Sequence, residues 1–304
     1  MTREELNQKK QQEIFFEQKH EKRKKITLFI FKLSFAIIIG FIMFYLYTTF
    51  VSTRIISVHE ERIINKKIPD SFNGLKIVQF SDLHFGTTFF EKEVKDVVNK
   101  INLRKPDIVV FTGDLIDKDY SISTNDQEKL IKQLKKIDAS LGKYAIYGEE
   151  DNNTFETIMR QSEFEILDNS YDVIYNNSDD PLLLVGLNTK DAQLNIDDGF
   201  AYFKEPTHNS NAYTITLLHK PDITDQVLNN FSSDLFLSGH SHNGYIVVPF
   251  VGGIYKNSEA KKYNSPYYKL DDSELFISSG LGTNGPGFRL FCRPSINFFR
   301  LSNR

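Results

Sequence analysis

The feature that most limits how this chain can fold is an uncharged apolar stretch, residues 33–51. It belongs to a longer hydrophobic segment, residues 26–51, in which Lys32 is the only charged residue. A helix needs about 20 apolar residues to cross the hydrocarbon core of a bilayer. Lys32 lies near one end, where its side chain can reach the headgroups, and Tyr45 and Tyr47 lie toward the other. The sequence therefore predicts a transmembrane helix over 26–51.

Two other interpretations of this segment fit less well. A buried core helix rarely stays uncharged over such a length. A cleaved signal peptide has a shorter apolar region, about 7–15 residues, that ends in an Ala-x-Ala-like site, and no such site follows Phe50 or Val51. We therefore expect an uncleaved signal anchor.

The basic run at 22–25 (KRKK) lies directly before this span. The positive-inside rule then predicts a single-pass protein of the cell membrane, with a cytoplasmic N-terminus and an extracytoplasmic body. Residues 1–25 are polar and rich in Gln, Glu and Lys, and we expect a basic tail that is mobile or helical.

The charge of the chain is unevenly distributed. Residues 1–25 contain eight Lys or Arg and five Asp or Glu, and residues 26–51 add only Lys32. The body, 52–304, therefore has 28 basic and 35 acidic residues, a net charge of −7. Binding to nucleic acid needs basic surface, so a nucleic-acid partner is unlikely on charge. The single cysteine, Cys292, excludes an intrachain disulfide, so the body must rely on its core.

The first half of the body alternates strand and helix patterns. After a polar linker at 52–70, the apolar runs 75–80, 108–111 and 144–147 are separated by helical patterns at 90–103 and 125–137. This alternation predicts an α/β fold with parallel strands. In the second half, only the segment after Pro221 has a helical pattern between short strand candidates, which indicates a second sheet packed on the first. These candidates are 166–167, 173–175, 182–185, 214–218, 235–237, 245–248 and 275–278.

Four polar clusters follow strand candidates, at the strand ends where ligands of α/β sheets gather. They supply Asp82 and His84, then Asp114, then His219, and last His240 and His242. Each alone has an ordinary explanation, such as a capped turn, a helix start or a structural histidine. Together they contain four of the seven histidines, whereas the other three (His20, His59 and His208) lie in polar stretches where we expect them to be solvated. The clusters predict a site for divalent metal ions.

The order of these motifs, D-x-H, G-D-x-x-D, a G-N-H-D-type turn, a later His and G-H-x-H, resembles the signature of calcineurin-like metallophosphoesterases, and in particular their membrane-anchored bacterial branch. The resemblance extends from residues 72–77 to the segments 279–283 and 289–294. It implies that residues 71–304 form a four-layer α/β/β/α sandwich with two mixed sheets, and that the chain hydrolyses phosphate esters or phosphoanhydrides.

The resemblance also implies a ligand set. Asp82, His84 and His242 would hold one ion, His219 and His240 would hold a second, and Asp114 would bridge the two. A hydroxide between the ions would be the nucleophile. Mixed imidazole and carboxylate ligands suit Mn, Fe or Zn better than Mg or Ca.

The third motif departs from the family pattern, because it is Gly148-Glu149-Glu150-Asp151 here. Glu149 takes the place of a metal-binding Asn, and we expect it to be a metal ligand. Glu150 takes the place of a His that assists the leaving group, and we place Glu150 and Asp151 with Asp114 among the candidate catalytic residues. A glutamate beside two cations should stay ionised, which makes it a poor proton donor. The fifth motif also departs, with Asn-Gly-Tyr at 243–245 where Gly-Gly-Gln is usual.

Three interpretations of this departure remain open. Glu149 can be a ligand in an active enzyme that favours phosphoanhydrides or activated diesters, whose leaving groups need no proton. Alternatively, the site binds metal and hydrolyses slowly, or the two glutamates form a solvated acidic turn. We favour the first, with a phosphorylated small molecule or a lipid headgroup as substrate. The alternative function is a metal-binding ectodomain with weakened catalysis that acts through interaction.

Overall fold

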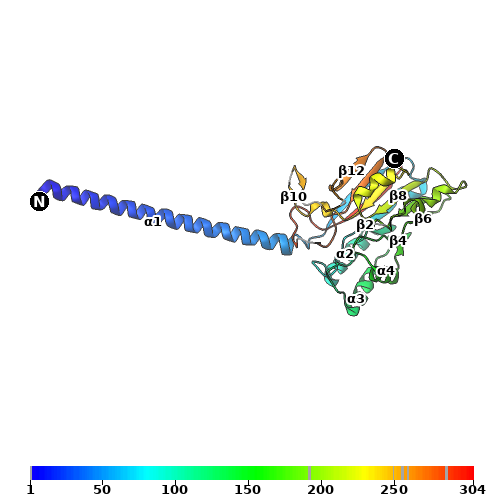
Figure 1. Ribbon diagram of the computed structural model, residues 1–304, viewed down its shortest axis with the longest axis horizontal. Helices are drawn as coiled ribbons and strands as arrows, with labels where there is room; N and C mark the ends of the chain where they lie inside the picture. Colours follow the sequence, from blue (N-terminus) through cyan, green and yellow to red (C-terminus); the bar gives the residue numbers. More distant parts are fainter. Residues whose placement is uncertain (1, 191–192, 249, 255–256, 259, 285–286) are drawn as a thin grey trace. The chain divides into compact units, whose positions relative to one another are not determined.

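The structure is a computed structural model of the 304-residue chain, and it describes residues 2–190, 193–248, 250–254, 257–258, 260–284 and 287–304. The chain separates into two compact units, Met1–Thr48 and Thr49–Arg304. Figure 1 shows the first as one long helix and the second as a packed α/β body.

The first unit consists of α1, Arg3–Leu46, which continues into the π-helical turn Tyr47–Val51. α1 begins at a capping box, in which the Thr2 hydroxyl accepts from the Glu5 amide and the Glu5 carboxylate accepts from the Thr2 amide. Its 44 residues span about 66 Å at 1.5 Å per residue. Among the described residues it is the one helix that is long and apolar enough to cross a membrane. The basic tail is therefore helical here and continuous with the apolar segment.

The first sheet of the second unit has six strands in the order β1-β14-β2-β3-β4-β5. β2, β3, β4 and β5 are parallel, β14 is antiparallel to β2, and β1 is parallel to β14. The strands are β1 Ser57–Ile64, β2 Lys76–Phe80, β3 Ile108–Phe111, β4 Gly142–Ala145, β5 Glu165–Ile166 and β14 Ser295–Ser302.

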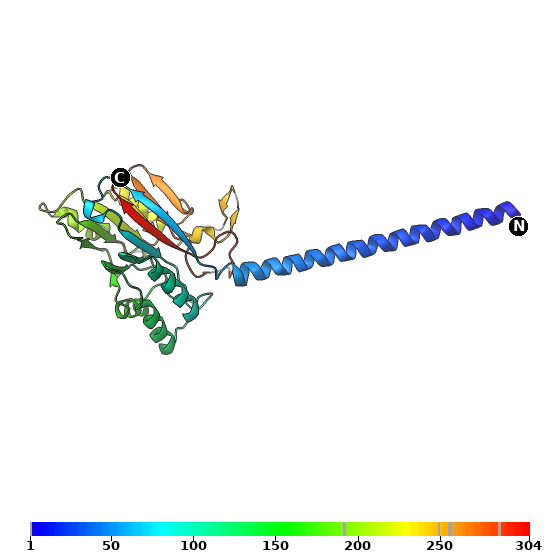
Figure 2. The ribbon, with the colours of Figure 1, turned by 180° about the vertical axis from the view of Figure 1, so that it is seen from behind.

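The second sheet also has six strands, in the order β12-β13-β9-β8-β7-β6, and its four inner strands are parallel. Its strands are β6 Ser170–Ile174, β7 Leu182–Gly186, β8 Tyr213–Leu218, β9 Leu235–Ser238, β12 Tyr267–Leu270 and β13 Ser273–Ile277. A separate small hairpin consists of β10 Val247–Val248 and β11 Gly252–Gly253. Figure 2 shows both sheets from the reverse side.

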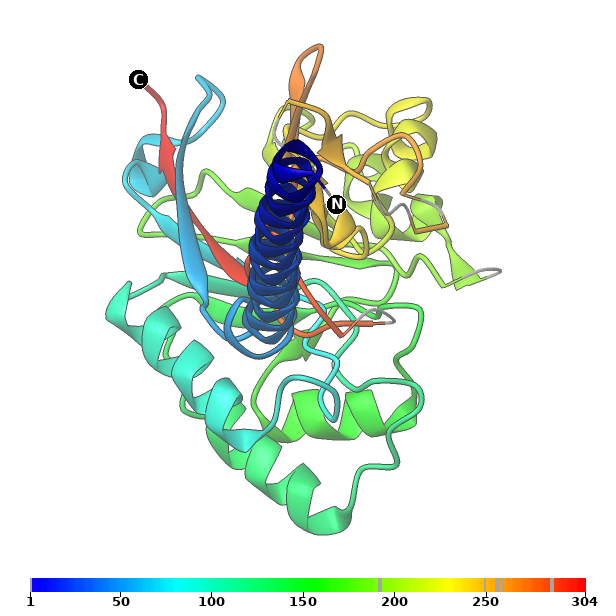
Figure 3. The same ribbon diagram turned by 90° about the vertical axis from the view of Figure 1, so that its left-hand side faces the viewer.

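The alternation of side chains along the strands creates three apolar layers. In β2, Val78 and Phe80 pack with the helices α2 Glu91–Leu103, α3 Thr124–Leu134 and α4 Asn153–Gln161, whereas Ile77 packs against the second sheet. The far face of the second sheet is covered by α5 Ile196–Gly199, α6 Thr224–Leu228 and the short 3₁₀ helices Ala201–Lys204 and Pro221–Ile223. Figure 3 shows this order of helices, sheet, sheet and helices. The predicted four-layer sandwich is confirmed.

The structure differs from the sequence-based expectation at residues 52–70. This segment contains β1, which pairs with β14 over eight residues, and it leads into the 3₁₀ turn Asp70–Phe72, so it is not a linker throughout. β1 is an edge strand with largely exposed side chains, and its charged residues conceal the strand pattern. β14, β12 and α4 are also absent from the sequence-based expectation.

Candidate metal centre

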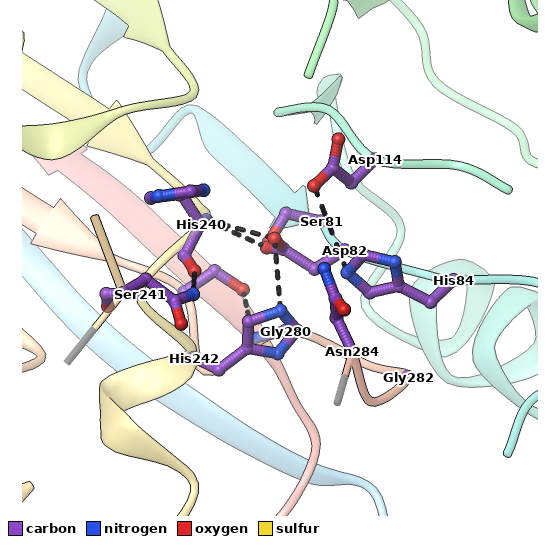
Figure 4. A network of polar contacts seen from close by, with 12 residues as sticks. Ser81, Asp82, His84, Asp114, His240, Ser241, His242, Gly280, Gly282 and Asn284 are labelled. Carbon is purple, nitrogen blue, oxygen red and sulfur yellow. Dashed lines mark hydrogen bonds and ion pairs between the residues drawn. The ribbon is translucent and has the colours of Figure 1, made fainter. Parts of the chain in front are cut away.

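Six side chains meet where the strands of both sheets end. Asp82 and His84 follow β2, and Asp114 follows β3, in the first sheet. His219 follows β8, and His240 and His242 follow β9, in the second. Because these strands are parallel within each sheet, their carboxyl ends open at one edge of the sandwich. Figure 4 shows His84, His242 and Asp114 around Asp82, with His240 beside them.

The turns that carry these residues adopt an unusual backbone conformation. Five of the six residues have positive φ angles: 49° at Asp82, 40° at His84, 60° at Asp114, 66° at His240 and 46° at His242. Each such non-glycine residue costs of order 1–3 kcal/mol and persists only where the surroundings enforce it. The surrounding loops supply this enforcement, since the Asp82 amide donates to the Gly113 carbonyl and the Gly282 amide donates to the Asp82 carbonyl, both at 2.8 Å.

The six side chains form two groups with Asp114 between them. The potential ligand atoms of Asp82, His84 and His242 lie within 4.8 Å of one another, and so do those of Asp114, His219 and His240. The Asp114 carboxylate is 3.1 Å from His219 Nε2 and 3.9 Å from His84 Nε2, so it reaches both groups. All six residues are buried.

Backbone carbonyls fix which nitrogen of two imidazoles carries the proton. His219 Nδ1 lies 2.7 Å from the Thr112 carbonyl oxygen, and His240 Nε2 lies 2.6 Å from that of Ser258. A carbonyl oxygen only accepts, so these nitrogens are N–H donors, and the opposite nitrogens are the ones that a metal ion would bind in place of a proton. Within the described part of the chain, His219 Nε2 and both ring nitrogens of His84 are buried without a hydrogen-bond partner. Unpaired buried nitrogens beside carboxylates fit metal ligation.

His242 differs from the other three imidazoles, because its Nδ1 lies 3.1 Å from a guanidinium nitrogen of Arg289. Arg289 is fully buried and also donates to the carbonyl oxygens of Ser279, Gly280 and Gly282. Burial and then the charge of Arg289 hold the pKa of His242 well below its usual range, so this imidazole is neutral. Sequence reasoning gave Arg289 no role, since nothing in its segment indicates a buried cation.

The charges of the pocket favour a cation at its centre. Burial raises the pKa of Asp82. Burial acts on Asp114 in the same direction, yet the positive charge of His219 holds the pKa of Asp114 below its usual value. In turn, Asp114 and Asp82 overcome burial and raise the pKa of His219 to about 10. A positive charge between these carboxylates is therefore strongly stabilised.

Comparison with known sequences agrees with this geometry, because the sequence model of the calcineurin-like phosphoesterase family matches residues 75–244. The chain belongs to this family. The uncharacterized metallophosphoesterase YkuE of Bacillus subtilis is 30% identical over 264 residues, covering 85% of this chain and 90% of that protein. The transmembrane protein with metallophosphoesterase domain of Danio rerio is 28% identical over 251 residues, covering 76% and 54%. The phosphodiesterase YaeI of Escherichia coli is 24% identical over 236 residues, covering 76% and 84%. The predicted family and enzyme class are confirmed, and the protein is a metal-dependent phosphoester hydrolase.

The two glutamates of the third family motif occupy different environments. Glu149 is 32% exposed, and its carboxylate lies 3.5 Å from His240 Nδ1 and 3.6 Å from Lys220 Nζ. Glu150 is only 5% exposed. Its carboxylate accepts from Asn284 Nδ2 at 2.5 Å and lies 3.3 Å from His84 Nδ1. The solvated acidic turn is therefore the interpretation that this geometry does not favour.

Asp151 lies behind the centre and holds two of its loops together. Its carboxylate accepts from the amides of Asp114, Leu115 and Gly148 at 2.8–2.9 Å. Burial and then Asp114 raise the pKa of Asp151 to about 7, while the three amide donors oppose this shift. These three hydrogen bonds of the Asp151 carboxylate all come from backbone amides. Asp151 is therefore placed to hold the loops in position.

Some residues around the centre were not singled out from the sequence as functional. Lys220 follows His219 directly and is buried beside Glu149. Asn284 contacts Glu150 from a distant loop, and Asp117 lies 3.9 Å from His84 Nδ1. Asp117 is the last residue of the G-D-x-x-D motif, so that motif is the signal that could have identified it.

We predict that Gly113→Ala disrupts the centre. Gly113 has φ +94°, and an added Cβ would lie 2.6 Å from the Gly148 backbone and from His219 Nδ1. The variant should lose at least about 1 kcal/mol of unfolding free energy and bind less metal per chain, measured by elemental analysis. In Gly287→Ala, the matched control, an added Cβ meets no atom of the described residues within 4 Å. Equal metal content in the two variants would show that this close approach does not matter.

Proposed function

We propose that the protein is a membrane-anchored hydrolase of phosphate esters or phosphoanhydrides that uses two divalent metal ions. The observation that carries the proposal is the position of Asp114 between two groups of buried ligands. Asp82, His84 and His242 would hold the first ion. His219, His240 and Glu149 would hold the second, and Asp114 would contact both. Mn, Fe or Zn suit this mixed donor set.

When bound, two such ions supply an activated water at neutral pH and stabilise charge on the phosphoryl oxygens. The chain's own residues supply the geometry. The Thr112 and Ser258 carbonyls orient the imidazoles of His219 and His240, and Asp151 ties the Asp114 loop to the Gly148 turn. The loops are therefore pre-organised for catalysis.

Lys220 supports the active interpretation of the altered third motif. Glu149 adds one negative charge where the family has a neutral Asn. The ammonium of Lys220, buried and 3.6 Å from the Glu149 carboxylate, offsets that charge. This ion pair reduces the effect of the extra negative charge on the second ligand group, so we do not favour the alternative of a weakened, purely interacting ectodomain.

We assign Glu150 a positioning role instead of the catalytic role expected from its place in the motif. Its carboxylate faces Nδ1 of His84, while Nε2 of His84 faces Asp114. A carboxylate this close to the far nitrogen of a ligating imidazole orients the ring and raises its basicity. Glu150 then donates no proton to a leaving group, which favours phosphoanhydrides and activated diesters as substrates.

The apolar part of α1 supports anchoring in the cell membrane. The basic residues at 22–25 favour a cytoplasmic N-terminus and an extracytoplasmic second unit. This unit, Thr49–Arg304, is called the hydrolase unit below. This location favours a lipid headgroup or another phosphorylated compound at the membrane as substrate.

The first test is Asp114→Asn in the full chain in detergent, with Mn²⁺ and bis(p-nitrophenyl) phosphate. Removing groups that only orient ligands costs about 10- to 100-fold in metal affinity or activity, so loss of a shared ligand should cost at least about 100-fold in turnover. Asp119→Asn, an exposed residue on the same loop, should match the parent chain. If Mn²⁺ does not increase the turnover of the parent chain, the result would favour the alternative function, a metal-binding ectodomain with weakened catalysis.

The second test is Glu149→Ala. Loss of a ligand should leave the first ion in place and reduce bound metal from two ions per chain toward one, measured by elemental analysis. Glu128→Ala, an exposed residue of α3, should retain both. Full occupancy together with unchanged turnover would rule Glu149 out as a ligand.

The third test is Glu150→Ala. Metal affinity of the first group should fall about 10- to 100-fold, while kcat at saturating Mn²⁺ stays close to that of the parent. Glu150→Gln keeps an acceptor oxygen without the charge, so its metal affinity should lie between those of the parent chain and Glu150→Ala. If metal affinity is unchanged and phenyl esters are lost selectively over p-nitrophenyl esters, Glu150 is a proton donor.

A further inference from the structure

The chain enters the hydrolase unit at the edge that carries the metal centre. β1 is parallel to β14, with Ser57 opposite Ser295. β14 is antiparallel to β2, with Asn297 opposite Gln79. The start of β1 therefore lies at the carboxyl end of β2, which leads directly into Asp82. The far end of β1 and the C-terminal end of β14 lie at the opposite edge.

This topology limits how far the centre can be from a membrane. The apolar segment ends at Val51 and β1 begins at Ser57. A fully extended chain covers at most about 3.3–3.6 Å per residue, so six residues reach about 20 Å. If the apolar segment crosses a bilayer, the edge of the sheet that carries the centre lies within about 20 Å of its surface.

Large apolar side chains are exposed at this same edge. They are Phe250, Val251 and Ile254 of the β10–β11 hairpin, together with Phe291, and we call these four residues the apolar rim. Phe250 is fully exposed, and Val251 and Phe291 are 77% and 72% exposed. Figure 1 shows the hairpin standing out from the body of the second unit. Soluble surfaces rarely expose such apolar groups together unless they bind a partner or a membrane.

Hydrogen bonds join the apolar rim to the entry point of the chain. The Val247 amide donates to the Leu290 carbonyl at 3.0 Å, which places the hairpin stem beside Phe291. The Ser57 amide donates to the Pro294 carbonyl at 2.8 Å. Arg54 and Arg293, which are exposed, flank this contact and suit anionic headgroups. The rim is thus continuous with the segment that leaves the apolar span.

Residues on both sides of the β10–β11 hairpin contact histidines of the metal centre. On one side, the Tyr245 ring stacks on His242 with centroids 4.4 Å apart. On the other, Asn257 Nδ2 donates to the His240 carbonyl at 2.5 Å, and the Ser258 carbonyl accepts from the His240 ring. A membrane or protein that binds the hairpin is therefore also held at a defined position relative to the metal centre.

We propose that the apolar rim docks into the interface of the bilayer that anchors the chain, so that the metal centre works at the membrane surface on phosphoesters carried by lipids. The proposal rests on the membrane anchoring proposed above. The docking itself does not depend on catalysis.

The chain contains no Trp, so a single introduced Trp reports on its own surroundings. The full-length Phe250→Trp variant is reconstituted into vesicles of phosphatidylcholine and phosphatidylglycerol. The Trp emission of this variant should be blue-shifted relative to that of the control below. Lipids brominated near the carbonyl end of the acyl chain should quench this emission several-fold. Leu103→Trp is the matched control, since Leu103 is 74% exposed at the end of α2, on the opposite edge, and should be quenched little.

Phe291→Trp provides a second position on the rim and should behave as Phe250→Trp does. Metal content equal to that of the parent chain shows that each variant is folded. Chains that float with the vesicles but show no more quenching than Leu103→Trp overturn docking and leave anchoring and catalysis intact. A blue shift without bromine quenching means that the rim packs on protein, such as a second copy, and also overturns docking. Chains that do not float overturn the anchoring and this proposal together.

Discussion

Six buried imidazole and carboxylate side chains must neutralise one another or a bound cation, inside an interior that solvates charge poorly. The rest of the second unit is organised around this requirement. Two sheets contribute their strand ends to one edge, and the loops beyond those strands bind each other's backbone. The His240 amide donates to Asp82, and the Asp114 amide donates to Asp151, so each carboxylate binds a loop that is distant in sequence. The charged groups are held in place by a backbone framework and not by their attraction alone.

The same framework explains why strained turns are retained. Left-handed conformations at aspartate and histidine are unfavourable in an isolated peptide. Here they allow two side chains of a three-residue motif, Asp82 and His84, to face the same pocket. Glycines at Gly113 and Gly148 let the β3 and β4 loops approach each other within van der Waals contact. The strain in these turns lowers the stability of the folded domain, and the turns in return give the pocket a shape that suits bound cations.

Much of this arrangement could be predicted from the sequence, and the exceptions have physical causes. Apolar runs such as Ile108–Phe111 are continuous because these strands are buried on both faces, and the polar residues after them mark the centre. β1 could not be predicted, since its charged side chains are tolerated at an exposed sheet edge. Nor could the burial of Arg289 or the separation of Glu149 from Glu150. Two adjacent glutamates look alike in a sequence, and only the fold directs one toward His240 and the other behind His84.

The position of β14 has a consequence for how the hydrolase unit forms. This strand, among the last residues of the chain, lies between β1 and β2, so Ser57 pairs with a residue more than 230 positions later. Until β14 is available, β2 has an open edge and β1 has no sheet to join. Synthesis from the N-terminus therefore leaves a long interval in which most of the chain exists without a complete first sheet. Such long-range pairing slows folding, and unpaired strand edges invite association with other chains.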